Sequence, residues 1–590
     1  MPVFTKRRCS RLLSTCLFLA VCLTSSLLLA MSFAPATASL GLNGAPGAQI
    51  NRQPVMYRVS VANTGDVQRL IQLGLDVLEA RGQGYVLVLG DQATPNQLAA
   101  HGFRAEVDPE LTRRSGFHPQ TFFQGYRTVQ EHYAHLDALA AAHPDLVAVV
   151  DYGDSWRKLN GRPDGHDLKA VCITKLGPGD PVLSPTAGKP RFFLMAAIHA
   201  RELTTSELAW RWMDYLVENY GVDADVTMLL DHTELWVVPV VNPDGRAIVE
   251  EGVEFPYFQR KNANDSLGNC DVPPSGGNQA GVDLNRNAGF QFGGAGTSSD
   301  PCSLVYKGVG PSSEPEQYFL EALLLQLFAD RRGPQLTDAA PGDTSGVFIT
   351  LHSFSDLVLL PWGWNECNGQ PCAGRFRAPN DEGLRTLAFR LSSFNEYTTG
   401  QGSEILYAAS GSTDDWTYGT LGIASFTFEV GPESGACAGF APEYSCQDEV
   451  FWPKNRGAFL YAAKVARNPY ACALGPTVTG LQVKPPVVKA GQSASVSATL
   501  DDKQFGTFGV RRPKAQKIQA VEYYIDTPPW AGGTARQCEA ADGKFNRPSE
   551  LVLATLPVSL SAGKHTIYVR GQDREGNWGP VSAVFVTVEP

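Results

Sequence analysis

The sequence predicts an α/β protein whose mixed, mainly parallel sheet is flanked by helices, with a ferredoxin-like α+β domain before it and a β-sandwich after it. Between residues 146 and 430, continuously apolar segments alternate with helical segments, and such strands are typical of a sheet buried on both faces. Residues 50–110 follow a β-α-β-β-α-β order. Residues 477–590 carry short alternating strands between Gly, Pro and Asp turns, as in a β-sandwich.

Length and composition set the limits of this prediction. A chain of 590 residues is too long for one core, so two to four domains are expected. We divide it into residues 1–38, 39–114, 115–474 and 475–590. Hydrophobic content of 43% and charged content of 18% are those of a globular protein. A formal net charge of −11, without a basic cluster after residue 38, argues against nucleic acid as a partner.

The first 38 residues have the three parts of a secretory signal peptide. Lys6-Arg7-Arg8 precedes the apolar stretch 12–29, and Ala36-Thr37-Ala38 offers a cleavage site before Ser39. The alternative is a retained membrane anchor, but the small residues and the Gly/Pro-rich sequence after them favour export. No other segment is long and apolar enough to span a bilayer. We therefore expect a secreted protein, extracellular or periplasmic, without stable membrane insertion after cleavage.

The N-terminal domain is expected to consist of four strands and two helices. Arg81-Gly82-Gln83-Gly84 joins the two middle strands, and Thr94 is the expected N-cap of the second helix. In chain order the strands are 57–61, 75–79, 85–89 and 103–107, and the helices are 66–73 and 95–100. This order is the ferredoxin-like plan.

The large middle domain begins with a helix and continues as alternating strands and helices. Thr128 and Glu131 form a capping box for the helix that ends near His143. The expected strands are 146–150, 169–173, 192–198, 235–241, 347–351 and 425–430, and the clearest helices are 205–220, 314–329 and 452–467. Sheets of this kind bind ligands at strand ends. His132 and His135 lack a further ligand nearby, so we interpret them as a solvated helix face.

The C-terminal domain begins where Gly475-Pro476 interrupts the last helix of the middle domain. Strands near 494–499, 520–525 and 565–569 predict a sandwich of immunoglobulin or fibronectin type III character. Residues 573–578 could offer oxygen ligands to calcium, but an ordinary polar turn is the simpler interpretation. The partner of this domain is unknown, and adhesion, carbohydrate binding and spacing all stay open as roles.

Three residues at strand ends have the character of a zinc site. His199 and Glu202 follow the apolar strand 192–198, and His352 ends the strand 347–351. Two imidazoles and one carboxylate make a catalytic zinc site with an open fourth position. The His-x-x-Glu spacing alone is weak, because a strand-end His beside an exposed Glu explains it equally well. The prediction depends on the motifs that accompany it.

Those motifs occur in a fixed order along the chain. They are Asn242–Arg246, Arg260–Asn262, Gly281–Asn287, Tyr407–Trp416 and Ser425–Glu429. Together with the two metal blocks, they resemble the zinc metallocarboxypeptidases of the carboxypeptidase A/B family over about residues 117–471. The resemblance implies a carboxypeptidase-like sheet, one Zn²⁺ per catalytic domain held by His199, Glu202 and His352, and peptide or protein C-termini as partners.

The chemistry of peptide C-terminus recognition agrees with the resemblance. A free carboxylate is best bound by the planar fork of Arg, and Asn285-Arg286 fits that role. In the family an Asn-Arg pair and a mobile Tyr, here Tyr407, hold the substrate carboxylate. Glu429 ends an apolar strand, where partial desolvation raises a carboxyl pKa, so it is the candidate general base. A salt-bridge Glu and a packed Tyr are the simpler alternatives.

Further roles follow from the resemblance. Arg260 matches the residue that stabilises the oxyanion, and Arg201 matches one that touches the substrate further from the scissile bond. Asp283 matches the carboxylate that accepts a hydrogen bond from the first His ligand, here His199. Each Arg could instead be a surface cation.

The specificity pocket of the family also has matching positions here. Asp414 matches the residue at the base of the pocket, which is apolar in A-type and Asp in B-type enzymes, and Gly402 matches the small B-type residue. A carboxylate in an enclosed pocket favours a cationic side chain. We therefore expect basic (Lys/Arg) or mixed C-terminal residues, unless Asp414 turns outward.

Cysteine usage is consistent with export. Nine of the twelve cysteines follow residue 38, so at least one lacks a partner within the chain. The family has a disulfide across the Asn285 loop, which implies the pair Cys270–Cys302. The short loops between Cys367 and Cys372 and between Cys437 and Cys446 are plausible on proximity. Cys172 is the expected buried thiol, whereas Cys472 and Cys538 are not placed.

The resemblance also implies that the N-terminal domain is a propeptide covering the active site. Arg113-Arg114 would then be the processing site, although a solvated basic pair is the alternative. The sequence thus predicts a secreted zinc-dependent exopeptidase made as a precursor. Two alternatives are a zinc amidohydrolase acting on peptidoglycan stems or small acylated amino acids, and a catalytically dead zinc-binding adhesive module. The Asn285-Arg286 pair and the Tyr407 motif are less expected in such an amidohydrolase. A dead module would not be expected to keep Glu429, Arg260, Asn285, Arg286 and Tyr407 together.

Overall fold

The computed structural model of the chain describes residues 55–590 except 83, 109–110, 112–121, 253–254, 368–371 and 373. The expected signal peptide, residues 1–38, and the pair Arg113-Arg114 lie outside the described residues. Among the described residues, no helix has the length and apolar character needed to cross a membrane.

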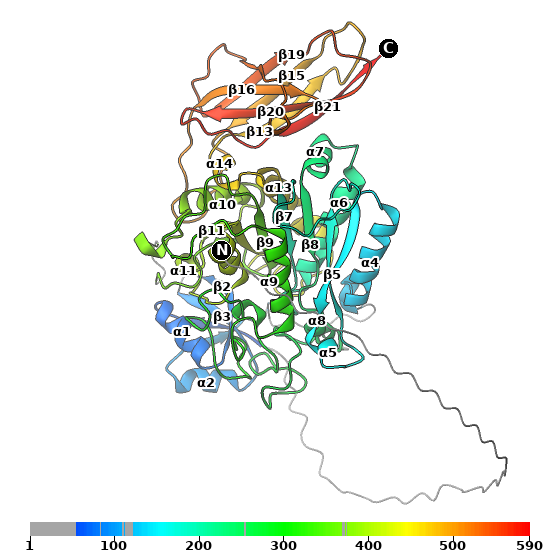
Figure 1. The fold of residues 1–590 in the computed structure, drawn as a ribbon. Coiled ribbons are helices and arrows are strands. Elements are labelled where there is room, and N and C mark those ends of the chain that lie inside the picture. Colours follow the sequence, from blue (N-terminus) through cyan, green and yellow to red (C-terminus); the bar gives the residue numbers. More distant parts are fainter. Residues whose placement is uncertain are drawn as a thin grey trace, which may run out of the picture. The chain divides into compact units, whose positions relative to one another are not determined.

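The N-terminal unit is a four-stranded antiparallel sheet with two helices (Figure 1). Its elements are β1 (Val55–Ser60), α1 (Thr64–Gln72), β2 (Asp76–Gly82), β3 (Tyr85–Gly90), α2 (Thr94–Ala100) and β4 (Ala105–Val107), and the strand order is β2-β3-β1-β4. Asn63 caps α1 by accepting from the N–H of Asp66. Thr94 is not the N-cap that we expected. Ala93 takes that position, and the Asp91 carboxylate accepts from the N–H groups of Ala93 and Thr94.

An eight-stranded mixed sheet forms the centre of the chain. The strands are β5 (Val147–Asp154), β6 (Asp167–Ile173), β7 (Arg191–Met195), β8 (Glu234–Val238), β9 (Val347–His352), β10 (Leu357–Leu360), β11 (Thr398–Gln401) and β12 (Ala424–Glu429). Their order is β11-β10-β12-β9-β7-β8-β6-β5. Four neighbouring pairs are parallel (β11/β10, β12/β9, β9/β7 and β7/β8). This confirms the predicted mixed, mainly parallel sheet.

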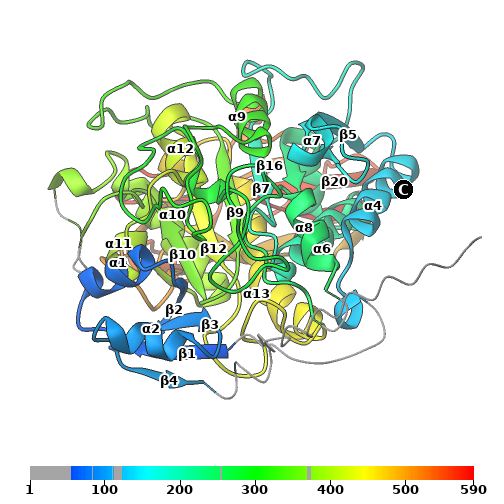
Figure 2. The same ribbon diagram turned by 90° about the horizontal axis from the view of Figure 1, so that it is seen from below.

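Helices cover both faces of this sheet, as predicted. The α-helices described in the middle domain are α4 (Val129–Ala142), α5 (Trp156–Leu159), α6 (Leu203–Asn219), α7 (Ala224–His232), α8 (Pro243–Glu250), α9 (Pro315–Leu327), α10 (Asp381–Asn395), α11 (Gly402–Ile405), α12 (Thr413–Trp416), α13 (Trp452–Val465) and α14 (Pro469–Cys472). Along β7, Phe192 and Leu194 face the core that contains α6 and α13, whereas Phe193 and Met195 face α9. Figure 2 shows the sheet between these two layers. The alternation of side chains along a strand produces both cores.

Helix α4 begins at the predicted capping box of Thr128 and Glu131. The interpretation of its histidines as a solvated face was wrong. His132 is 1% exposed, and His135 stacks on Trp210 of α6 with ring centroids 3.5 Å apart. Burial, followed by the charge of Arg246, lowers the pKa of His132 well below its usual range. The two histidines form part of a helix–helix contact that the sequence of α4 alone does not reveal.

The C-terminal unit contains two sheets that share one apolar core. Its strands are β13 (Thr477–Lys484), β14 (Val487–Lys489), β15 (Ser495–Asp501), β16 (Ile518–Ile525), β17 (Arg536–Gln537), β18 (Glu539–Ala540), β19 (Ser549–Thr555), β20 (Gly563–Asp573) and β21 (Ser582–Glu589). The sheets have the orders β13-β15-β19-β18 and β14-β21-β20-β16-β17. The Asp573 carboxylate accepts hydrogen bonds from Glu575 and Asn577 of its own turn, as in an ordinary polar turn.

Three disulfides stabilise loops of the middle domain. They join Cys270 to Cys302, Cys367 to Cys372 and Cys437 to Cys446. Cys172 is a buried free thiol, and Cys472 and Cys538 are also free.

Candidate metal centre

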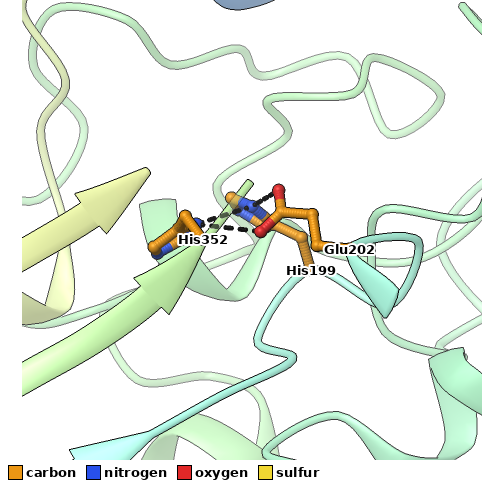
Figure 3. A group of neighbouring side chains, drawn as sticks. All are labelled: His199, Glu202 and His352. Atoms are coloured by element: carbon orange, nitrogen blue, oxygen red, sulfur yellow. Dashed lines mark hydrogen bonds and ion pairs between the residues drawn. The ribbon is translucent and has the colours of Figure 1, made fainter. Parts of the chain in front are cut away.

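Three candidate ligands converge at the carboxyl ends of neighbouring parallel strands. His199 and Glu202 lie on the turn between β7 and α6, and His352 is the last residue of β9 (Figure 3). The Nδ1 atom of His199 is 2.7 Å from Oε1 of Glu202 and 3.1 Å from Nδ1 of His352. Oε2 of Glu202 is 3.2 Å from Nδ1 of His352. All three residues are at most 1% exposed.

This arrangement fits a metal ion. One donor atom from each residue lies within 4.8 Å of the others, and two imidazole nitrogens with one carboxylate are a donor set that Zn²⁺ binds. Burial opposes ionisation of Glu202, but the imidazoles of His199 and His352 hold its pKa well below its usual range. The carboxylate is therefore in the charged form that a metal requires.

Asp283 orients the first imidazole. Its Oδ1 atom is 3.2 Å from Nε2 of His199 and accepts from the N–H of Asn285, and its Oδ2 atom accepts from Nε of Arg260. A hydrogen bond from Nε2 of His199 to Asp283 leaves Nδ1 with its lone pair toward Glu202 and His352. Burial disfavours the Asp283 carboxylate, but Arg260 and Arg286 keep its pKa well below the usual range. The structure thus brings Asp283 and Arg260 together beside the candidate metal ligands.

Glu429 ends the strand next to that of His352. In the parallel pairing of β12 with β9, Glu429 and His352 occupy partner positions, and Glu429 is 3% exposed. The carboxyl ends of β7, β9 and β12 therefore hold both His ligands and the candidate base at one edge of the sheet.

Asn285 connects the metal centre to helix α12. Its Nδ2 atom is 3.4 Å from Nε2 of His352, and its Oδ1 atom accepts from the N–H and hydroxyl of Thr413. Arg286 is 3% exposed and donates from Nε to the carbonyl of Gly296 and from Nη1 to that of Asn285. Asp414 is the next residue of α12 after Thr413. Asn285 is therefore bonded to the helix one residue before Asp414.

Asp415, the neighbour of Asp414, fixes a loop that the sequence did not connect with the site. Both carboxylate oxygens of Asp415 accept from the N–H of Gly363, at 2.9 and 3.0 Å, and one also accepts from that of Trp364. A Cβ atom on Gly402 would lie 3.8 Å from Cα of Gly363. The start of α11 therefore lies against the loop that Asp415 fixes.

Arg201 contacts the N-terminal unit. Its guanidinium forms an ion pair with both oxygens of Asp76 on β2 and lies 4.2 Å from the ring centroid of Phe440. Arg201 and Asp76 are 2% and 3% exposed. Asp76 was not among the predicted site residues, although a carboxylate next to the apolar pair Val77-Leu78 could have suggested a buried cation.

Tyr407 also contacts the N-terminal unit. It is 8% exposed and belongs, with Leu357, Leu359 and Leu406, to an apolar cluster built mainly from β1, α1 and β3. The side chain of Gln68 on α1 donates to the carbonyl of Ala408 at 3.4 Å. In this structure, two of the predicted substrate-binding residues, Arg201 and Tyr407, are covered by the N-terminal unit.

Comparisons with known proteins agree with this site. The family model described as zinc carboxypeptidase matches residues 132–453. Carboxypeptidase A2 of Mus musculus is 30% identical over 391 residues, which cover 65% of this chain and 77% of the mouse protein. Carboxypeptidase A2 of Rattus norvegicus is 32% identical over 311 residues, covering 52% and 63% of the two chains.

A solved structure shows the same fold. The crystal structure of the carboxypeptidase A from Helicoverpa armigera has a TM-score of 0.53 and 23% sequence identity, and the likeness covers 72% of this chain and 99% of that one. Because the family model matches more than half of its residues, the chain belongs to the zinc carboxypeptidase family.

Proposed function

We propose that the chain is the precursor of an exported zinc-dependent enzyme that hydrolyses the C-terminal peptide bond of peptides and proteins. The observation that carries this proposal is the meeting of His199, Glu202 and His352 with Glu429 at the carboxyl ends of β7, β9 and β12. Membership of the zinc carboxypeptidase family supports the same reaction.

The metal ligands and Glu429 divide the chemistry between them. His199, Glu202 and His352 would hold one zinc ion, which when bound polarises the scissile carbonyl and lowers the pKa of water toward about 7. Glu429 accepts the proton of the attacking water and passes it to the leaving amine, a general-base contribution of typically about 10²–10⁴ in rate. Its burial at the end of β12 favours this role, since partial desolvation makes a carboxylate more basic.

Four further residues bind the substrate in this proposal. Arg286 receives the free C-terminal carboxylate with Asn285 beside it, and Tyr407 completes the contact once it is uncovered. Arg260, which is oriented by Asp283, donates to the oxyanion, and loss of such a donor typically costs about 3 kcal/mol. The requirement for a free carboxylate follows from the fork geometry of the Arg286 guanidinium.

The pocket for the C-terminal side chain favours a basic residue. Asp414 is 6% exposed, and its carboxylate makes no hydrogen bond or ion pair with any residue that the structure describes. A cationic side chain would relieve the cost of this enclosed charge. Gly402 corresponds to the small residue of B-type enzymes, and a small residue at this position would leave room for a long substrate side chain. We therefore propose a preference for Lys or Arg at the substrate C-terminus. In the less selective form of this proposal, the enzyme accepts basic and other C-terminal residues.

The N-terminal unit is proposed to be an inhibitory propeptide. Its support is the Asp76–Arg201 ion pair and the apolar cluster around Tyr407, both of which occupy groups that a substrate would need. Cleavage at Arg113-Arg114 would release the unit. The disulfides agree with an oxidising, extracellular or periplasmic location.

A peptide panel tests the activity. We expect the trimmed protein to release one residue from peptides with a free C-terminal carboxylate and none from the same peptides with a C-terminal amide. The kcat/KM should be higher for Arg-terminated than for Phe-terminated substrates, and Asp414→Ile should reverse that order. Equal cleavage of free and amidated peptides would contradict the exopeptidase assignment. A wild-type preference for Phe would contradict only the role of Asp414.

A further inference from the structure

Residues 505–512 of the C-terminal unit, here called the docking segment, lie on the edge of the central sheet. The N–H of Thr399 on β11 donates to the carbonyl of Phe508 at 3.1 Å, and the N–H of Val510 donates to the carbonyl of Thr399 at 2.8 Å. Thr399 and Gly509 form a parallel bridge. Since β11 is the outer strand of the sheet, the docking segment satisfies backbone groups that would otherwise face solvent.

Two glycines permit this close contact. A Cβ atom on Gly509 would lie 2.3 Å from the carbonyl oxygen of Thr399 and 2.8 Å from the Phe389 ring. A Cβ on Gly506 would lie 2.1 Å from Oγ of Ser392. All three distances are too short for a side chain, so the backbone of the docking segment fits directly against α10 and β11.

Arg511 of the docking segment enters a cluster of charges in the middle domain. Its guanidinium donates to Asp381 at 2.8 Å and to Oε1 of Glu404 at 3.0 Å. Arg385 donates to the same two residues, to Asp381 at 2.9 Å and to Oε2 of Glu404 at 3.1 Å. Without Arg511, two carboxylates would share one arginine, and the Glu404 side chain is fully buried. Arg511 therefore balances a buried negative charge.

Glu404 is in turn the residue that fixes α11. Its Oε2 atom accepts from the N–H of Gln401 at 2.9 Å, and its Oε1 atom accepts from the N–H of Cys372 at 2.8 Å. Helix α11 begins at Gly402, which lies against Gly363, and it leads directly into Tyr407. The position of this turn thus depends on the same carboxylate that Arg511 binds.

We infer that Arg511 is a positioning residue for the substrate pocket. By holding Glu404, it fixes the turn 402–407 that lines the pocket for the C-terminal side chain of the substrate. This inference rests on the proposed carboxypeptidase function and gives the C-terminal unit a part in selectivity. The C-terminal unit contacts the middle domain through the Arg511–Glu404 ion pair and through backbone hydrogen bonds to the edge strand β11.

The test compares two substrates on protein that is trimmed at Arg113-Arg114 and keeps the C-terminal unit. One ends in Ala, whose side chain barely enters the pocket, and the other ends in Arg or Phe, whichever the wild type cleaves better. In Arg511→Ala we expect kcat/KM for the large residue to fall about tenfold, mainly through KM, because a displaced pocket wall loses contacts that only this substrate makes. The value for the Ala substrate and the zinc content should stay within about twofold.

Arg512→Ala is the matched control, because within the part of the chain that the structure describes the Arg512 guanidinium donates only to the backbone carbonyls of Gly506 and Phe505. It should leave the ratio of the two kcat/KM values unchanged. Arg511→Lys keeps the charge and should restore part of the ratio. If Arg511→Ala gives no soluble protein, Arg511→Lys carries the test through a smaller fall in the same ratio.

The inference is overturned if the ratio in the Arg511 variants equals that of the wild type, or if both substrates are affected equally. Failure of the proposed function gives a different result, since the wild type would then release no C-terminal residue from either substrate.

Discussion

The units that precede and follow the central sheet both contact the middle domain through arginine–carboxylate ion pairs, but with opposite consequences. In the N-terminal contact, Arg201 of the middle domain forms an ion pair with Asp76 of the N-terminal unit. In the C-terminal contact, the middle domain supplies Glu404 and Asp381, and Arg511 completes them. The first contact engages groups proposed to bind substrate, whereas the second supports such groups from behind.

The two contacts also differ in what surrounds the charges. The N-terminal unit adds an apolar cluster around Tyr407, which its departure would uncover. The C-terminal unit adds backbone hydrogen bonds to Thr399 and a second buried pair, Arg390–Asp502. The N-terminal contact, apolar with an ion pair, is consistent with a unit that is proposed to be removed. The polar network of the C-terminal contact is consistent with a unit that stays attached. The difference therefore predicts opposite outcomes when each contact is broken.

Breaking the C-terminal contact should have the largest effect, and it should be on stability. Arg390 and Asp502 are 0% and 1% exposed as side chains, so Arg390→Met would leave a buried carboxylate without its partner. We expect the free energy of unfolding to fall by about 3–5 kcal/mol, measured by urea denaturation. Arg547→Ala, which removes an exposed pair with Asp542, should cost less than about 1 kcal/mol. Similar values for both variants would mean that the contact is incidental.

Removing the N-terminal unit should instead raise activity. Cleavage at Arg113-Arg114 would expose Arg201 and Tyr407, and we expect the rate on one peptide substrate to increase at least tenfold, which corresponds to about 1.4 kcal/mol. Rates before and after limited trypsin treatment measure the change. The double variant Arg113→Gln/Arg114→Gln should resist the activation. Equal rates for precursor and trimmed protein would show that the unit is a spectator.

The smallest effect is expected from the single ion pair in the N-terminal contact. Asp76→Ala leaves Arg201 without its carboxylate and should raise the activity of the intact precursor a few-fold, while the trimmed enzyme is unaffected. Arg58→Ala is the control, because Arg58 pairs with Asp108 inside the N-terminal unit. If both variants raise precursor activity alike, general loosening of the unit explains the result, and the Asp76–Arg201 pair has no special part.

The sequence predicted what is local and missed what joins distant segments. His199 and His352 were recognisable because each follows an apolar run in the sequence, and the parallel pairing of β7 with β9 then brings the ends of these runs together. Asp76 and Arg201 are 125 positions apart, and Glu404 and Arg511 are 107 apart. Neither pair leaves a periodic or spacing signal.

The same limit applies to the fold. The buried strands β7, β8, β9 and β12 were predicted from continuous apolar runs, but β11 has the sequence Thr398-Thr399-Gly400-Gln401 and is too short and polar for such a signal. It becomes a strand because β10 pairs with it on one side and the docking segment on the other. His132 was misassigned for a related reason, since α6 buries it.

The central claim is that His199, Glu202 and His352 hold a catalytic metal and that Glu429 acts as the base. Zinc content and turnover measured on the same samples test it most directly. We predict that Glu429→Gln retains one zinc per chain while kcat falls by a factor of about 10²–10⁴ or more. The double variant His199→Ala/His352→Ala should retain no stoichiometric zinc. Full activity in Glu429→Gln, or one zinc per chain in the double histidine variant, would contradict the account.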